Sequence, residues 1–343
     1  MVGNENWKSR NRRVTLLLVF AVLVVACSRG TEARYPENQG YGYMTSMGFV
    51  TAAMPVGAMP MQLSATPTQP GDPINNIDMP WLRGRGQEVF TEMREGLQPQ
   101  PRARVEGIPL LVDDDPGVVN AFAACTSTGK AVIVISDGLY DIMAHLAQCK
   151  ATDEKFGTNK TDEYIQYMAK NQKWGDPVIH PPESFWNPAR KNNPDKIQRQ
   201  HEIYDEEVGF ILGHEMAHHY FGHLPCSAGN VTASEANVVI RSVAPGFNQI
   251  NEVGADTGST HNVLDAGVQQ DGYHWTENGG VLVMTFFAGI RAFRPEDVVF
   301  SFESSHPPAA LRIPIIQQAA QGWRMTRGAK TPVPIPAGIP WPF

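Results

Sequence analysis

The residues with the clearest chemical potential run from His214 to His223, in the order His-Glu-Met-Ala-His-His-Tyr-Phe-Gly-His. On an α-helix, His214 and His218 lie about one turn apart and point the same way, so both imidazoles can bind one zinc ion. Glu215 can then reach a water molecule on that ion and take its proton. The spacing predicts a hydrolytic metal site with one Zn²⁺ ion as its cofactor.

Catalytic zinc sites have three protein ligands and keep one position for water, so a further ligand is expected downstream. A third histidine six places after His218 is excluded, because Leu224 stands there. Glu235 and Glu252 remain as candidates. Glu252 is favoured because Asp256 follows one helical turn later and can hold the outer N–H of a ligand histidine. The alternative is that Glu252 and Asp256 form a solvated helix face.

The surrounding pattern predicts an α+β fold, mostly α, with a small antiparallel sheet and an active-site helix. Short strands are predicted at 109–112, 120–124 and 131–136, the last of them a candidate edge for an extended peptide. Helices are predicted at 81–95, 137–149 (capped by Asp137), 162–171, 235–243, 248–266, 281–293 and 308–321, with the motif helix opening at 204 or 205. Residues 151–200 are polar and contain prolines, with an irregular excursion after the helix at 162–171, and we hypothesise that this segment is a lid.

Further motifs accompany the histidines in order along the chain. They are Asn-Ala-Phe at 120–122, Gly129, Gly-Leu at 138–139, His223, Glu-x-x-x-Asp at 252–256, and Ser-His-Pro at 305–307 followed by Arg312. With these motifs, roughly residues 81–325 resemble the gluzincin metallopeptidases that include HtpX, the mitochondrial Oma-type proteases and the CAAX prenyl endopeptidases. The multispan membrane helices of some relatives have no counterpart, so the chain looks like an envelope-facing branch of that group.

The resemblance implies a zincin-like domain and a zinc-dependent endopeptidase acting on protein or peptide substrates. His214, His218 and Glu252 would be the zinc ligands, and Glu215 the general base. We hypothesise a role in protein quality control. A non-catalytic zinc-fold lipoprotein with chaperone-like binding is the alternative, although binding alone needs no general base. Zinc hydrolysis of a non-peptide substrate is a third possibility.

The resemblance also assigns roles around the metal. His306 would donate to the tetrahedral oxyanion, and Asp256 and Arg312 would support the ligands from behind. For the remaining histidines we expect packing or surface roles. His219 would be rotated away from the ligand face, and His223 would pack or bond at the end of the motif helix. No partner pattern in the sequence accompanies His145, His180, His201, His261 and His274.

The N-terminal residues are typical of a lipoprotein signal peptide at 1–26. Four basic residues between 8 and 13 precede an apolar run at 14–26, and the run ends in Val-Val-Ala-Cys, which resembles a lipobox. We therefore expect lipidation of Cys27 and attachment to the periplasmic face of a bacterial envelope, at the outer membrane where one exists. An uncleaved anchor or a plain signal peptide is the alternative. A flexible tether at 27–80, a metallopeptidase domain at 81–330 and a proline-rich tail at 331–343 would follow.

The net charge and the cysteine content limit which binding partners and which disulfide bonds are possible. The net charge of −7 shows no basic footprint for nucleic acid. Cys125, Cys149 and Cys226 allow one disulfide and one free thiol in an oxidising compartment, and the sequence does not choose the pair. Three buried free cysteines are the alternative.

Overall fold

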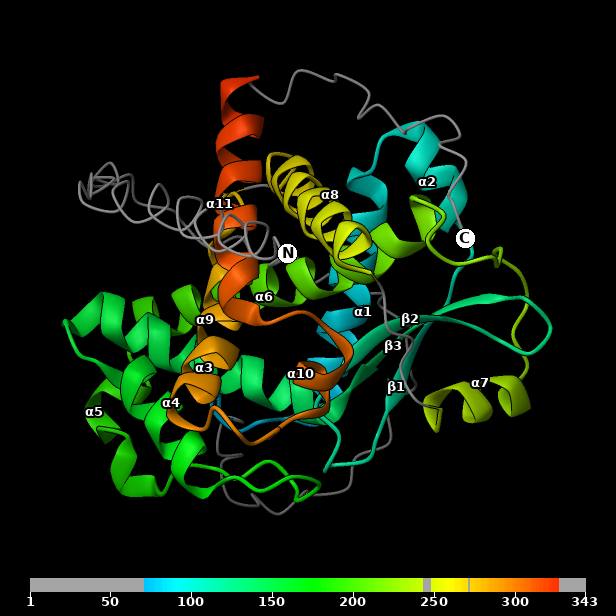
Figure 1. Ribbon diagram of the computed structural model, residues 1–343. Helices are drawn as coiled ribbons and strands as arrows, with labels where there is room; N and C mark the ends of the chain where they lie inside the picture. Colours follow the sequence, from blue (N-terminus) through cyan, green and yellow to red (C-terminus); the bar gives the residue numbers. More distant parts are fainter. Residues whose placement is uncertain (1–70, 243–247, 271, 327–343) are drawn as a thin grey trace, which may run out of the picture. The chain divides into compact units, whose positions relative to one another are not determined.

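Helices dominate the computed structural model, which describes residues 71–242, 248–270 and 272–326 (Figure 1). These residues all belong to one unit of the chain, Met61–Phe343. The predicted signal peptide, most of the predicted tether, Cys27 and the proline-rich tail lie outside the described residues. Among the helices that are described, none has the length and hydrophobicity needed to cross a bilayer.

The described helices and strands follow one another in an order that confirms the mostly helical α+β prediction. They are α1 (Met79–Gly96), α2 (Pro99–Val105), β1 (Leu110–Asp113), β2 (Ala121–Cys125), β3 (Ala131–Ser136), α3 (Asp137–Phe156), α4 (Lys160–Asn171), the 3-10 turn η1 (Glu183–Phe185), α5 (Pro188–Lys191), α6 (Pro194–Tyr220), α7 (Ala233–Ile240), α8 (Gln249–Gly267), α9 (Asn278–Phe293), α10 (Ser301–Ser305) and α11 (Ala309–Met325).

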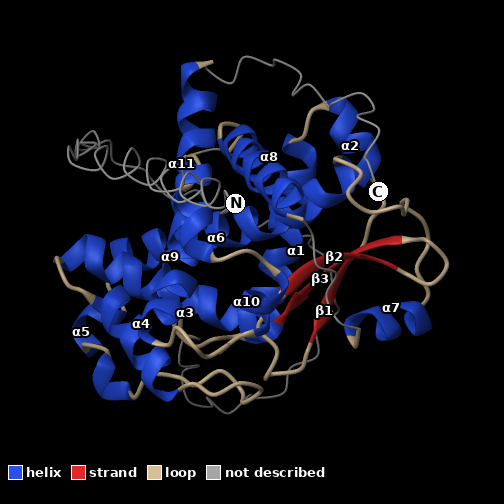
Figure 2. Cartoon of the chain, in the orientation of Figure 1, coloured by secondary structure: helices blue, strands red, loops and turns tan. Residues whose placement is uncertain are grey.

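The three strands form one mixed sheet in the order β1-β3-β2 (Figure 2). β1 pairs with β3 in parallel and β2 pairs with β3 antiparallel, so the prediction of an antiparallel sheet is wrong for one of the two pairings. The prediction that 131–136 is an edge strand is also wrong, because β3 is central. All six β3 residues are buried. A strand that is apolar on both faces is stabilised most in the middle of a sheet, where another strand pairs with each of its edges.

Helix α6 is the element around which the other helices pack, with contacts to α1, α3, α8 and α9 as well as to β2 and β3. It begins at Pro194, ten residues before the predicted start at 204. Asn193 caps it by accepting a hydrogen bond from the Lys196 N–H, and proline follows at the first helical position. That Asn-Pro pair is the local start signal that the prediction overlooked.

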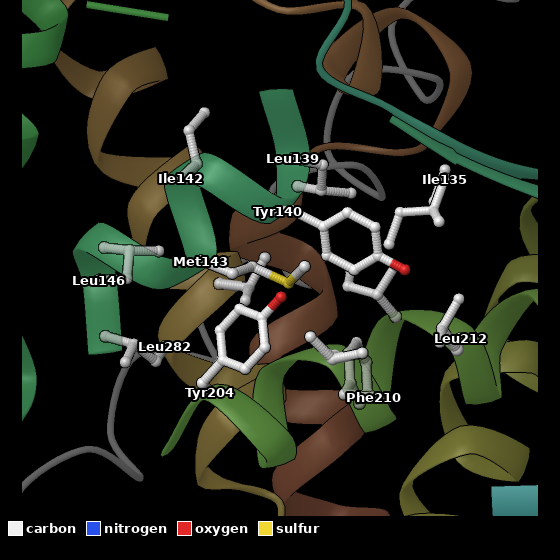
Figure 3. Packing of buried hydrophobic residues seen from close by; sticks show 14 of the residues in the cluster. Ile135, Leu139, Tyr140, Ile142, Met143, Leu146, Tyr204, Phe210, Leu212 and Leu282 are labelled. Atoms are coloured by element: carbon white, nitrogen blue, oxygen red, sulfur yellow. The ribbon is translucent and has the colours of Figure 1, made fainter. Parts of the chain in front are cut away.

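Helix α3 follows β3 directly in the chain and packs against α6. Ser136 caps it rather than Asp137, because the Ser136 hydroxyl accepts from the Leu139 N–H. The helix continues past Cys149 to Phe156, where Gly157 takes the left-handed conformation that ends it. Figure 3 shows side chains of α3 packed against those of α6, including Tyr140 and Tyr204.

The folded domain begins before the predicted boundary at 81. Ile74 is fully buried in the main core, and the Asp72 carboxylate contacts His201 of α6 at 2.6 Å. These contacts hold residues 71–78 against α6, although the sequence predicts that they belong to the tether.

Cys125 at the end of β2 and Cys226 in the loop after α6 form a disulfide, with their Cα atoms 5.6 Å apart. Cys149 is a buried free thiol on α3. The structure thus chooses one pair among the three that the sequence allowed. This bridge and the packing of α6 against β2 hold the sheet beside the motif helix.

Candidate metal centre

Helix α6 presents the motif histidines side by side. The Nε2 atoms of His214 and His218 are 3.1 Å apart, and both rings are buried. This follows from the four-residue spacing, which places the two side chains one above the other on the same helix face.

Helix α8 brings Glu252 to the same point. Its carboxylate oxygens lie 3.4 Å from Nε2 of His214 and 3.5 Å from Nε2 of His218. Both oxygens are buried and make no hydrogen bond to any residue that the structure describes. A zinc ion about 2.0–2.1 Å from each of its ligands needs tetrahedral donors about 3.3 Å apart. The donor spacing, and a carboxylate buried at a cost without a hydrogen bond, both fit a divalent cation at this point.

Asp256 lies one turn beyond Glu252 and reaches the outer nitrogen of His214. Its Oδ1 is 3.0 Å from Nδ1 of His214, so the imidazole can donate Nδ1–H to the carboxylate and turn the Nε2 lone pair toward the centre. Arg312 of α11 donates to both oxygens of Asp256, at 2.7 Å from Nη2 and 3.0 Å from Nε. Asp256 is thus the acidic group that Arg312 contacts near the centre.

His223 contacts the outer nitrogen of His218, as Asp256 contacts the outer nitrogen of His214. The Nδ1 atoms of the two rings are 2.9 Å apart, across the end of α6. The contact requires one ring to donate to the other, and donation by His218 leaves its Nε2 lone pair facing the centre. Sequence reasoning expected His223 only to pack or bond at the helix end, and so missed this positioning role.

The charges of the centre attract a cation. Burial and the Arg312 charge each lower the pKa of His214, but Asp256 and Glu252 outweigh them and raise it to about 9. Burial and the charge on His214 hold the pKa of His218 far below its ordinary value. Burial alone would raise the pKa of Glu252, yet contact with His214 keeps it lowered. One positive charge is therefore stabilised between these side chains.

Glu215 lies between the histidines and the sheet. Its Oε2 accepts a hydrogen bond of 2.7 Å from the Ala123 N–H on β2, and its Oε1 is 3.6 Å from Nε2 of His306. No sequence signal could have found the Ala123 contact, because it uses a backbone group of a strand that is 92 residues away in the chain.

His306 follows α10 and is buried beside the histidine pair, with its ring stacked on Phe302 at 4.4 Å. Its ligand-capable atom lies within 4.8 Å of those of His214 and Glu252. Ser305 lies 2.9 Å from its Nδ1. The Nε2 atom that faces Glu215 is therefore the one available to a substrate.

The structure keeps the other candidates away from the centre. Glu235 accepts from Thr232 in a capping box at the start of α7. His219 is turned toward the sheet and contacts the Val132 carbonyl of β3 at 3.0 Å, which agrees with the packing role expected for it. Three of the histidines without a partner pattern in the sequence contact carboxylates: His145 and His180 contact Asp141, and His201 contacts Asp72.

Two histidines and a glutamate on one helix, with a carboxylate from a second helix, form the arrangement of a zinc-dependent peptidase. Residues 101–270 match the model of peptidase family M48. The chain belongs to this family of zinc metallopeptidases, which confirms the predicted resemblance. No curated protein and no solved structure matches the chain significantly.

Proposed function

We propose that this chain is a zinc-dependent endopeptidase in which His214, His218 and Glu252 bind the ion and Glu215 is the general base. The proposal rests on the buried Glu252 carboxylate, which faces two imidazole nitrogens and has no hydrogen-bond partner within the described part of the chain. When bound, zinc lowers the pKa of a coordinated water and polarises the scissile carbonyl.

Glu215 is oriented for proton transfer by the sheet. The Ala123 N–H holds Oε2, so Oε1 is the oxygen that can accept a proton and later pass it to the leaving amine. His306 lies on the other side of Oε1, and its Nε2–H can donate to the oxygen on which negative charge develops. Both groups are buried, which strengthens these interactions.

Strand β2 offers the edge along which we propose that the substrate binds. The Ser136 N–H donates to the Asn120 carbonyl, and the Thr126 N–H donates to the Lys130 carbonyl. In an antiparallel pair, alternate residues bond to the partner strand, so the residues between these two turn their N–H and C=O groups away from β3 at every second position. These outward-facing residues are Ala121, Ala123 and Cys125. An extended peptide can add to this edge by backbone hydrogen bonds beside Glu215.

A cavity of about 1020 Å³ lies at the N-terminal end of the same strand. Its lining includes Asn120, which precedes β2, Phe122 of β2, Ser305 next to His306, and the acidic residues of 113–115. We propose that it receives a side chain of the bound substrate.

We further propose that the enzyme is lipid-anchored through Cys27 in the bacterial envelope and acts on misfolded or unassembled proteins. The basic and apolar pattern of residues 1–26 and the lipobox-like ending support the anchor. The chaperone-like alternative is disfavoured by Glu215, whose placement next to the histidine pair is not needed for binding alone.

The test is the Glu215→Gln variant of the full chain, assayed on casein and on a quenched peptide with and without chelator. We expect cleavage to fall by at least about a hundredfold, while zinc content stays that of the wild type. Glu235→Gln is the matched control, because Glu235 lies in the capping box of α7 away from the centre, and it should cleave normally. Normal cleavage by Glu215→Gln would overturn the mechanism. Casein binding without cleavage by the wild type would favour the chaperone-like reading.

A further inference from the structure

A second group of metal-capable side chains lies apart from the histidine motif. Asp141 and His145 are one turn apart on α3, and His180 comes from the segment between α4 and η1. One Asp141 oxygen is 2.8 Å from Nδ1 of His145, and the other is 2.7 Å from Nε2 of His180. The ligand-capable atoms of all three residues lie within 4.8 Å of one another.

Two side chains of this group are held in place by burial, and the third is open to solvent. Asp141 and His145 are buried, and the His145 ring stacks on Tyr164 with centroids 5.3 Å apart. The His180 side chain is 51% exposed, so an ion can enter from solvent and keep a water ligand on that side. Two ligands are therefore held in place before an ion arrives, and only the third has to adjust.

Two nitrogens and one carboxylate are ligands that zinc and neighbouring transition metals favour. An ordinary histidine–aspartate pair, such as His201 with Asp72, brings one ring to a carboxylate. Here two rings from separate segments turn a nitrogen toward one buried carboxylate. We propose that Asp141, His145 and His180 bind a second divalent transition-metal ion, with Zn²⁺ as the best match to the ligand set.

Binding requires a small adjustment. Zinc ligands are about 3.3 Å apart, so the present spacing of 2.7 and 2.8 Å has to open by about half an ångström. His180 lies outside regular secondary structure and can move outward. The His145 Nδ1 would also give up its contact of 3.1 Å with the Asp141 carbonyl.

The ion would tie the segment at 172–182 to α3. That segment also contacts the loop before β2, since the Val178 N–H bonds to the Pro116 carbonyl. Trp174, on the same segment, lines the cavity at the end of β2. An ion at Asp141 would therefore stabilise one wall of the cavity beside the metal centre.

The test uses the full-length double variant His214→Asn/His218→Asn, which removes the motif ligands. After stripping with chelator and equilibrium dialysis against Zn²⁺, we expect this variant to retain one ion per chain and to lose it when His180→Asn is added. His201→Asn is the matched control and should leave that ion bound. Cobalt added in place of zinc should give a visible d–d absorption that His180→Asn abolishes.

No bound ion in a folded His214→Asn/His218→Asn variant would overturn the proposal, as would retention of the ion after His180→Asn. Circular dichroism checks that each variant is folded. The outcome is independent of the proposed catalytic site. If the motif residues bound no zinc, the wild type would still hold one ion that His180→Asn removes.

Discussion

The pair formed by Arg312 and Asp256 allows a quantitative test of how the centre is supported. Arg312 is 1% exposed and Asp256 is fully buried, and the two share hydrogen bonds to both carboxylate oxygens. The Arg312→Met variant keeps most of the side-chain volume but removes the guanidinium, which leaves the buried carboxylate with only the His214 ring beside it. Breaking such a pair costs about 3–5 kcal/mol of the free energy of unfolding, or roughly a thousandfold in the unfolding constant.

The double variant Arg312→Met/Asp256→Asn should recover a large part of that loss, because both buried charges are then removed. Urea unfolding of the metal-free proteins measures the effect without the contribution of bound zinc. The exposed pair Arg102 with Glu106 provides the control, and Arg102→Met should cost less than about 1 kcal/mol. The reasoning is refuted if Arg312→Met costs no more than Arg102→Met, or if the double variant is no more stable than Arg312→Met.

Three further predictions concern separate features of the chain. Burial raises the pKa of Glu206 from 4.5 to about 7, so this carboxyl destabilises the fold increasingly as the pH rises from 4.5 to 7, by up to about 3 kcal/mol. Urea unfolding across that range should show a flatter pH dependence for Glu206→Gln. Replacing Cys125 and Cys226 by alanine should lower the free energy of unfolding by about 2–5 kcal/mol, since the bridge joins residues separated by 101 positions; an unchanged urea midpoint would contradict this. Glu252→Gln should weaken zinc binding at least about a hundredfold in a competition titration, and unaltered affinity would exclude it as a ligand.

The sequence by itself determined the local features of this protein. The spacing of His214 and His218 places both rings on one face because a helix repeats every 3.6 residues. The same repeat places Glu252 and Asp256 one above the other on α8. Caps and periodic apolar residues also predicted most helices and all three strands, often to within three residues of the observed bounds. These signals are local, so the residues near each position are sufficient to read them.

The tertiary structure decided which distant segments meet. β3 takes the centre of the sheet, Cys125 pairs with Cys226, the Ala123 N–H holds Glu215, and His180 reaches Asp141. None of these contacts follows from a periodicity or a cap. Each depends on how the apolar faces of α3, α6 and the sheet bury one another, which is settled only when the whole core packs.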